Sequence, residues 1–195
     1  MTRPVLRTII GFALVAGINA CTNGEEPLVR TESLQEKLPS IEEAALNWRP
    51  DAYLVQAEVE LLSGDSQRSL IVAGFQSPSQ ESESLMVILD QDGSIVTERV
   101  PHTVPVRQTE PILNEHWELD TSDAFEKALS EEGRDYLLSN PESQCSRLVL
   151  YRNVRKPGEP VEWSLSLGGC LLEGLFQRTT IDPITGEILS RQNFP

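Results

Sequence analysis

Two groups of residues could carry chemistry in this chain. Ser66 follows Gly64 and Asp65 and could act as a nucleophile, but such a serine needs a histidine oriented by an acid. Neither histidine, His102 or His116, has an aspartate three residues before it. Small polar residues around glycine are also typical of turns, so a turn at 63–66 is the favoured interpretation of this motif and a hydrolase remains the alternative.

The second group is the alternating segment 116–120. In a strand, His116, Glu118 and Asp120 would share one face, while Trp117 and Leu119 would share the other. Three such side chains could bind a divalent metal ion. No second histidine lies nearby in the sequence, and prolines precede the segment. We therefore expect a solvated face here, with a metal site as the alternative, and no cofactor.

The three cysteines separate into one near the N-terminus, Cys21, and a pair, Cys145 and Cys170. Residues 147–151 and 161–167 are predicted strands joined by a turn at Pro157 and Gly158. In an antiparallel pair centred on that turn, the numbers of paired residues add up to about 315, which brings Cys145 opposite Cys170. The spacing predicts a disulfide between them, and two buried free thiols are the alternative.

The N-terminus has the layout of a secretory signal peptide. Arg3 and Arg7 are followed by an uncharged apolar run over 8–18, which is too short for the roughly 20 residues that span a bilayer. The end of this run, residues 18–21, resembles the lipobox of bacterial lipoproteins, and this resemblance implies cleavage before Cys21 and lipidation of that cysteine. Simple cleavage after Ala20 is the alternative. Both place the protein outside the cytoplasm.

Charge and composition limit the class of partner. The chain has 195 residues, with 30 acidic and 16 basic side chains, and a formal net charge of −14. Binding to nucleic acid requires clustered lysine and arginine, so this balance argues against it. The acidic residues are concentrated in segment 110–135, which contains nine of them and only two basic residues. We expect this segment to be a solubilising face, with a basic partner as the alternative.

The hydrophobic pattern divides the chain into five parts. We predict a signal peptide at 1–20, a lipidated cysteine and flexible tether at 21–32, a first module at 33–100, a connector at 101–119 and a second module at 120–195. In both modules an amphipathic helix precedes several strands. Both also end in a similar turn, at 90–93 and at 182–186. The pattern predicts the α+β class, with two modules that each pack a helix on an antiparallel sheet. Because each module is too small for a large core, we expect the two modules to pack together or to extend one sheet.

The closing segment carries a family resemblance. A helix, a strand around Trp163 and the run Ile181-Asp182-Pro183-Ile184-Thr185-Gly186-Glu187-Ile188-Leu189 resemble the PepSY domain. Asp182 can accept backbone hydrogen bonds in this turn, Thr185 belongs to the same signature, and Gly186 can adopt a positive φ. The resemblance covers about 120–195 well and 40–98 weakly. It implies a small, non-catalytic binding module of exported bacterial proteins, for which inhibition of peptidases has been proposed.

Together these features predict a lipoprotein without enzymatic activity. It would be held by a lipid on Cys21 at the cell envelope, either at the outer membrane facing the periplasm or at the outer face of the cell membrane. There it would bind a peptide, a protein or an envelope component, and such binding could modulate a peptidase. The alternatives are an envelope hydrolase or metal-binding protein that uses Ser66 or the 116–120 group, and a purely structural lipoprotein.

Overall fold

The computed structural model describes residues 31–62, 69–103, 108–140, 145–168 and 174–194. The first half of the chain forms α1 (Leu34–Trp48), β1 (Tyr53–Leu62), β2 (Ser69–Gln76), β3 (Glu83–Leu89) and β4 (Ile95–Pro101). A 3₁₀ turn, η1 (Asn114–His116), leads to α2 (Thr121–Ala128) and α3 (Glu131–Ser139). The last strands are β5 (Cys145–Arg152), β6 (Val161–Gly168), β7 (Leu175–Ile181) and β8 (Ile188–Asn193).

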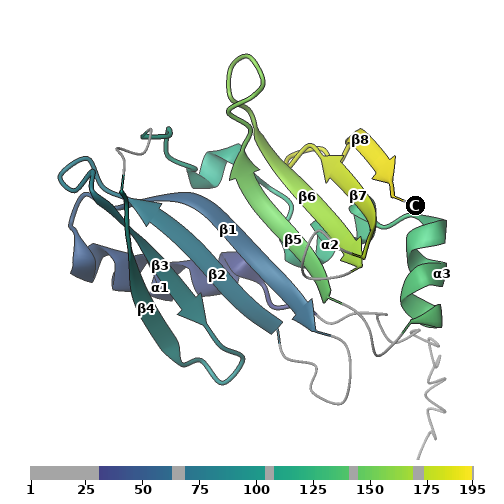
Figure 1. Ribbon diagram of the computed structural model, residues 1–195, viewed down its shortest axis with the longest axis horizontal. Coiled ribbons are helices and arrows are strands. Elements are labelled where there is room, and N and C mark those ends of the chain that lie inside the picture. The colour runs from purple at the N-terminus through teal and green to yellow at the C-terminus, as the bar shows by residue number, and fades with distance from the viewer. Residues whose placement is uncertain (1–30, 63–68, 104–107, 141–144, 169–173, 195) are drawn as a thin grey trace, which may run out of the picture.

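All eight strands belong to one antiparallel sheet, in the order β4-β3-β2-β1-β5-β6-β7-β8 (Figure 1). The two halves join where β1 pairs with β5 over seven residues, from Gln56 opposite Tyr151 to Leu62 opposite Cys145. The predicted α+β class with two helix-on-sheet modules is therefore wrong. The described part of the chain is mostly β, with three short α-helices, and its sheet continues across the boundary that was predicted to separate two modules.

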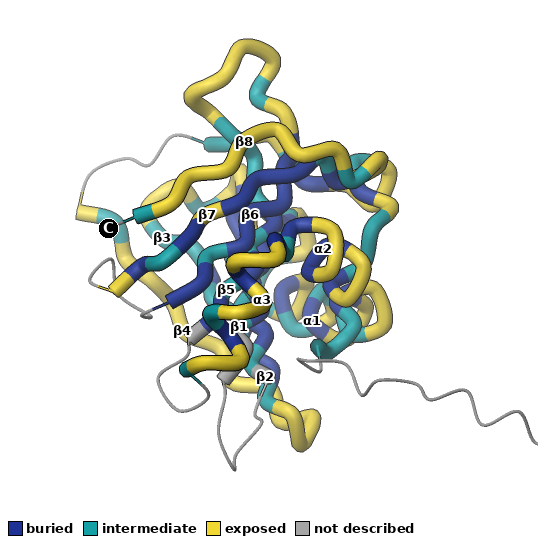
Figure 2. Tube along the Cα trace, turned by 90° about the vertical axis from the view of Figure 1, so that its right-hand side faces the viewer, coloured by how far each residue is buried: buried dark blue, intermediate teal, exposed yellow. Residues whose placement is uncertain are grey.

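α1 and α2 lie on one face of the sheet, and the residues buried between them and the strands form the hydrophobic core (Figure 2). α1 contacts strands β1 to β4, and α2 contacts β6 and β7. The buried side chains form one cluster that runs across both halves, from Phe75 and Val87 to Trp163 and Ile181. Because the sheet and the core are both shared, neither half has a core of its own.

Neither α1 nor α2 covers the opposite face of the sheet. One row of residues crosses all eight strands on this face, in the order Val96, Ile88, Val72, Glu58, Val149, Ser164, Thr180 and Ser190. At the joint of the two halves, the Arg147 guanidinium contacts Glu58 at 2.8 Å and Glu60 at 3.4 Å. Burial raises the pKa of Glu58, while Arg147 opposes that shift.

The β5–β6 hairpin differs from its predicted register. Arg147 lies opposite Ser166 and Val149 opposite Ser164, so paired numbers add up to 313 rather than 315. The loop bends at Gly158 and Glu159, both with positive φ, and Asn153 N–H donates to the Pro160 carbonyl. Cys170 lies outside the described residues, as does the side chain of Cys145, so the disulfide stays a prediction.

The turn between β7 and β8 is closed by Asp182. Its Oδ1 accepts from the backbone N–H groups of Ile184, at 2.9 Å, and Thr185, at 2.8 Å, and from the Thr185 hydroxyl. These donors lower the pKa of Asp182, with the Thr185 backbone contributing most. Gly186 has a φ of 75°, where a side chain is strained. The turn presents the Pro183 carbonyl, which accepts from Glu118 and Leu119 N–H, both at 3.0 Å.

Candidate functional site

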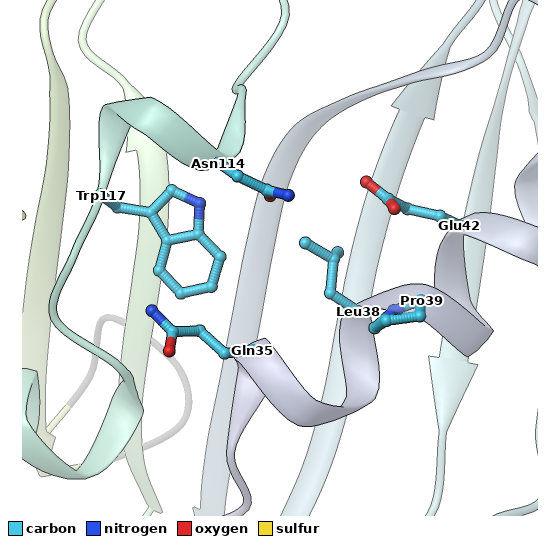
Figure 3. A pocket seen from close by; sticks show the side chains of 6 residues that line it. All are labelled: Gln35, Leu38, Pro39, Glu42, Asn114 and Trp117. Atoms are coloured by element: carbon cyan, nitrogen blue, oxygen red, sulfur yellow. The ribbon is translucent and has the colours of Figure 1, made fainter.

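A pocket of about 260 Å³ opens on the helical side of the molecule, between α1 and the segment that leads to α2. Six residues line it: Gln35, Leu38, Pro39, Glu42, Asn114 and Trp117 (Figure 3). Its volume is just below the roughly 300 Å³ at which pockets for drug-sized ligands begin. The pocket therefore has room for one large side chain or a fragment.

One wall of the pocket is a stripe on α1. Residues at positions i, i+3, i+4 and i+7 share a helix face, and Gln35, Leu38, Pro39 and Glu42 have this spacing. Leu38 is 4% exposed and belongs also to the core. Pro39 has no N–H to donate to the Gln35 carbonyl, which is the usual partner at that position in a helix.

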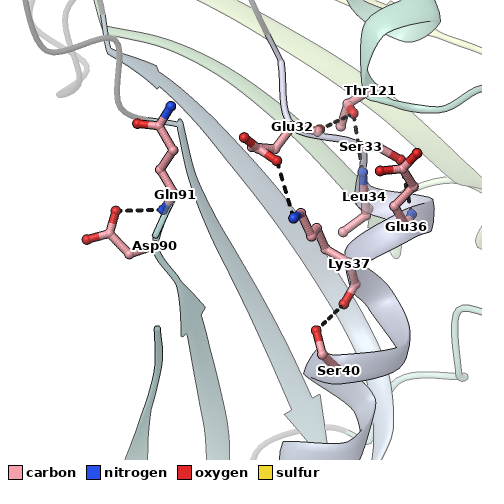
Figure 4. Close-up of polar contacts among 9 residues, drawn as sticks. All are labelled: Glu32, Ser33, Leu34, Glu36, Lys37, Ser40, Asp90, Gln91 and Thr121. Atoms are coloured by element: carbon pink, nitrogen blue, oxygen red, sulfur yellow. Dashed lines mark hydrogen bonds and ion pairs between the residues drawn. The ribbon is translucent and has the colours of Figure 1, made fainter. Parts of the chain in front are cut away.

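The start of α1 is fixed by polar contacts to the segment before α2. The Ser33 hydroxyl caps the helix by accepting from Glu36 N–H at 3.0 Å. The Thr121 hydroxyl donates to the Glu32 carbonyl and accepts from Leu34 N–H (Figure 4). Gln35 adds two contacts, because its N–H donates to Asp120 and its side-chain amide donates to the Glu118 carbonyl. The two walls of the pocket are thus held together at this end.

The other wall is formed by residues 110–119, which we call the strap. Arg152, at the end of β5, connects the strap to the sheet. Its guanidinium donates to the carbonyls of Glu110 at 3.1 Å and Pro111 at 2.7 Å in the strap, and to the carbonyl of Glu159 in the hairpin loop at 2.8 Å. Ile112 N–H donates to the Leu54 carbonyl. In the 3₁₀ turn, side chains at i and i+3 eclipse, so Asn114 and Trp117 lie on the same side.

Trp117 is the most unusual residue of the pocket. It is 3% exposed and packs edge-on against Trp163, with ring centroids 6.0 Å apart and planes at 80°. The Trp163 indole N–H donates to the Leu119 carbonyl, and that of Trp48 donates to Glu83. The Trp117 indole N–H, by contrast, is buried and has no hydrogen-bond partner among the described residues.

The indole nitrogen of Trp117 faces the pocket. Figure 3 shows the edge of the ring that carries it turned toward Asn114 and the space between Asn114 and Leu38. A buried donor without an acceptor costs about 1–3 kcal/mol. A ligand that supplies an acceptor here would recover part of that free energy. The nitrogen is shielded from solvent, and the exposed Asn114 side chain lies beside it (Figure 3).

Glu42 gives the pocket its charge. Figure 3 shows its carboxylate pointing from α1 toward the side occupied by Asn114. Burial raises the pKa of Glu42, because desolvation disfavours the charged form. No salt bridge or hydrogen bond joins this carboxylate to another side chain within the described residues. The neighbouring Glu43 is exposed and does not line the pocket.

The candidate metal ligands of the 116–120 segment do not come together. His116 Nδ1 accepts from Leu113 N–H at 3.0 Å and lies 3.4 Å from Arg152. Asp120 accepts from the start of α1, and the Glu118 side chain is exposed. Among the described residues, no group of three or more His, Cys, Asp or Glu side chains is placed to hold a metal ion.

Of the other predicted site residues, Cys21 and Ser66 lie outside the described parts of the chain. The structure instead pairs another serine with a histidine, since Ser84 Oγ lies 2.8 Å from His102 Nε2. Nothing in the sequence pointed to this pair, because Ser84 is in β3 and His102 follows β4. No carboxylate among the described residues contacts the other ring nitrogen of His102, so the pair lacks the acid that orients such a base.

Comparison with protein-family models, with curated proteins and with solved structures gives no match for this chain. In the part of the chain that the structure describes, no helix is long and apolar enough to cross a membrane. The site is therefore interpreted from its own geometry. The sequence singled out the segment 116–120 for His116, Glu118 and Asp120, whereas the structure directs attention to Trp117, on the opposite face of the same alternating pattern.

Proposed function

We propose that this chain is a non-catalytic binding protein of the cell envelope, anchored by a lipid on Cys21, and that it binds a peptide or a protein segment through the pocket between α1 and the strap. The observation that carries the proposal is the buried, unpartnered indole N–H of Trp117 in the pocket wall. A peptide offers a carbonyl acceptor at every residue and side chains of the size that the pocket admits.

The walls of the pocket support binding rather than catalysis. Trp117 and Leu38 are fixed in the core, and polar contacts tie the start of α1 to residues 118–121. A preorganised site loses less conformational entropy when a ligand binds. Trp117, Asn114 and Gln35 are not groups that act as nucleophile or general base, and the carboxylate of Glu42 has no second titratable residue beside it in the lining.

The binding claim can be tested by selecting displayed random peptides on the immobilised chain. Asn114 is exposed and lines the pocket, so Asn114→Trp should fill the pocket with little effect on the core, and Asn114→Ala should open it. Leu113→Trp is the matched control, since Leu113 is 48% exposed and is not part of the lining. We expect peptides to be enriched on wild type, Asn114→Ala and Leu113→Trp, and lost on Asn114→Trp. Equal enrichment on all four refutes the assignment.

The anchor has a separate test. In a bacterial host, the full chain should incorporate radiolabelled palmitate and fractionate with membranes, and Cys21→Ser should abolish both. Unchanged membrane association of Cys21→Ser contradicts the lipid anchor but leaves the pocket assignment untouched.

A further inference from the structure

The charges around the pocket indicate which side chain it takes. This inference rests on the proposed binding function and goes on to the chemistry of the ligand. Glu42 places a partly buried carboxylate in the wall, and no described cation satisfies it. A desolvated carboxylate gains most from a ligand that brings a positive charge and hydrogen-bond donors.

The surroundings reinforce the preference for a cation. On the strap, Glu115 and Glu118 are exposed, and the chain as a whole has a net charge of −14. None of the described residues that line the pocket is basic, and two basic residues that belong to or contact its walls are already engaged. The Arg152 side chain is 7% exposed and bound to backbone carbonyls, and Lys37 pairs with Glu32 at 3.7 Å. An anionic ligand would meet repulsion with nothing to offset it, while a cationic one would be attracted.

We infer that the pocket recognises an arginine side chain of a peptide, with its guanidinium on Glu42 and a backbone carbonyl of the same peptide accepting the Trp117 indole N–H. Arginine fits this site better than lysine for a geometric reason. The guanidinium is planar and carries five donors in a fixed fork, so it can engage a carboxylate through two parallel hydrogen bonds. The lining also offers the amide of Asn114 as a further acceptor, and the aliphatic stem of the arginine can lie on Leu38 and Pro39.

The inference is tested with three small probes: N-acetyl-arginine methylamide, the citrulline analogue, which has nearly the same shape without charge, and the apolar norleucine analogue. Affinities are read from the backbone amide shifts of residues 35–42 in ¹H–¹⁵N spectra of the full chain. For a probe of about sixteen heavy atoms, we expect the arginine compound to bind with a Kd of the order of 1 mM. The citrulline and norleucine probes should bind about tenfold more weakly, because each lacks the charge-assisted contact.

Two variants assign the preference to Glu42. Glu42→Gln should weaken the arginine probe about tenfold and leave the citrulline probe unchanged. Glu43→Gln removes the same charge from the next, exposed position and should change the arginine affinity less than twofold. Equal affinity of the arginine and citrulline probes, or equal effects of the two variants, overturns the inference and leaves peptide binding by the pocket intact. If none of the three probes shifts the 35–42 amides, the inference falls, whereas the peptide selection decides the proposed function.

Discussion

Replacing Arg152 with methionine should loosen the strap and disturb the pocket wall that the strap forms. The Arg152 side chain is 7% exposed and donates to three backbone carbonyls, two of them on the strap. Hydrogen bonds from a charged donor contribute about 1.5–3 kcal/mol each, but the carbonyl of an exposed residue such as Glu110 can bind water once it is released. We therefore take about 1 kcal/mol for each bond and expect a loss of about 3 kcal/mol in the free energy of unfolding.

For a chain of this length, that loss corresponds to a decrease of about 6–12 °C in Tm. It is measured by urea and thermal unfolding, with Arg155→Met as the control, because Arg155 is exposed at the tip of the same hairpin. Arg152→Lys should recover only part of the loss, since an ammonium cannot span three carbonyls in different directions. Tryptophan emission of Arg152→Met should also shift to the red as Trp117 becomes more exposed. If Arg152→Met loses no more stability than Arg155→Met, the strap is held by something else and the reasoning fails.

Three further predictions test local features. The donors around Asp182 lower its pKa below 3.8, so its contribution to stability is present above that value and lost as the pH falls through the folded-state pKa. Asp182→Asn should therefore be less stable than wild type near neutral pH, and urea unfolding at decreasing pH should show the stabilities of the two proteins converge. Burial and, second, the hydrogen bond to Glu162 raise the pKa of Tyr151 to about 12, so the protonated phenol stabilises the fold below pH 10.0 and this contribution is lost as the pH rises through about 12. An absorbance titration should show this late ionisation, which should disappear in Tyr151→Phe and move toward 10 in Glu162→Gln. Thiol titration of the exported chain, unfolded without reductant, should find neither Cys145 nor Cys170 free, and two free thiols there would contradict the disulfide.

Local signals in the sequence predicted local structure well. The turn chemistry of Asp182 and Gly186 and the helical spacing of Leu38, Ile41 and Ala45 all correspond to observed elements. The helix begins at Leu34, where the Ser33 hydroxyl caps it, and it continues through Pro39, although that residue cannot donate to the Gln35 carbonyl.

The arrangement of the sheet could not be read in the same way. The pairing of β1 with β5 joins residues such as Val59 and Leu148, which are far apart in the sequence, and no turn between them fixes their register. Alternation of apolar and polar residues indicates which face of a strand is buried. The same alternation is expected for a strand at the edge of a small module and for one in the middle of a large sheet. The repeated order of helix and strands therefore favoured two modules where the structure has one sheet.

The pocket was hidden from the sequence for a related reason. Its walls come from α1 and from the strap, which contains Pro111, and no motif in either of them predicts a pocket. One signal was available: Trp117 alternates with polar neighbours, which predicts a buried face, and a buried tryptophan requires an acceptor for its N–H. Only the three-dimensional structure shows that the Trp163 N–H donates to the Leu119 carbonyl, whereas the Trp117 N–H has no acceptor among the described residues.

The most direct test of peptide binding compares these two tryptophans in one spectrum. The indole N–H resonance of each is identified by its loss in Trp117→Phe or Trp163→Phe, and the full chain is then saturated with a peptide from the display selection. The account predicts that the Trp117 N–H moves downfield as it gains a carbonyl acceptor, while the Trp163 N–H, already bonded to Leu119, stays nearly unchanged. A bound peptide that leaves the Trp117 resonance in place would contradict the account.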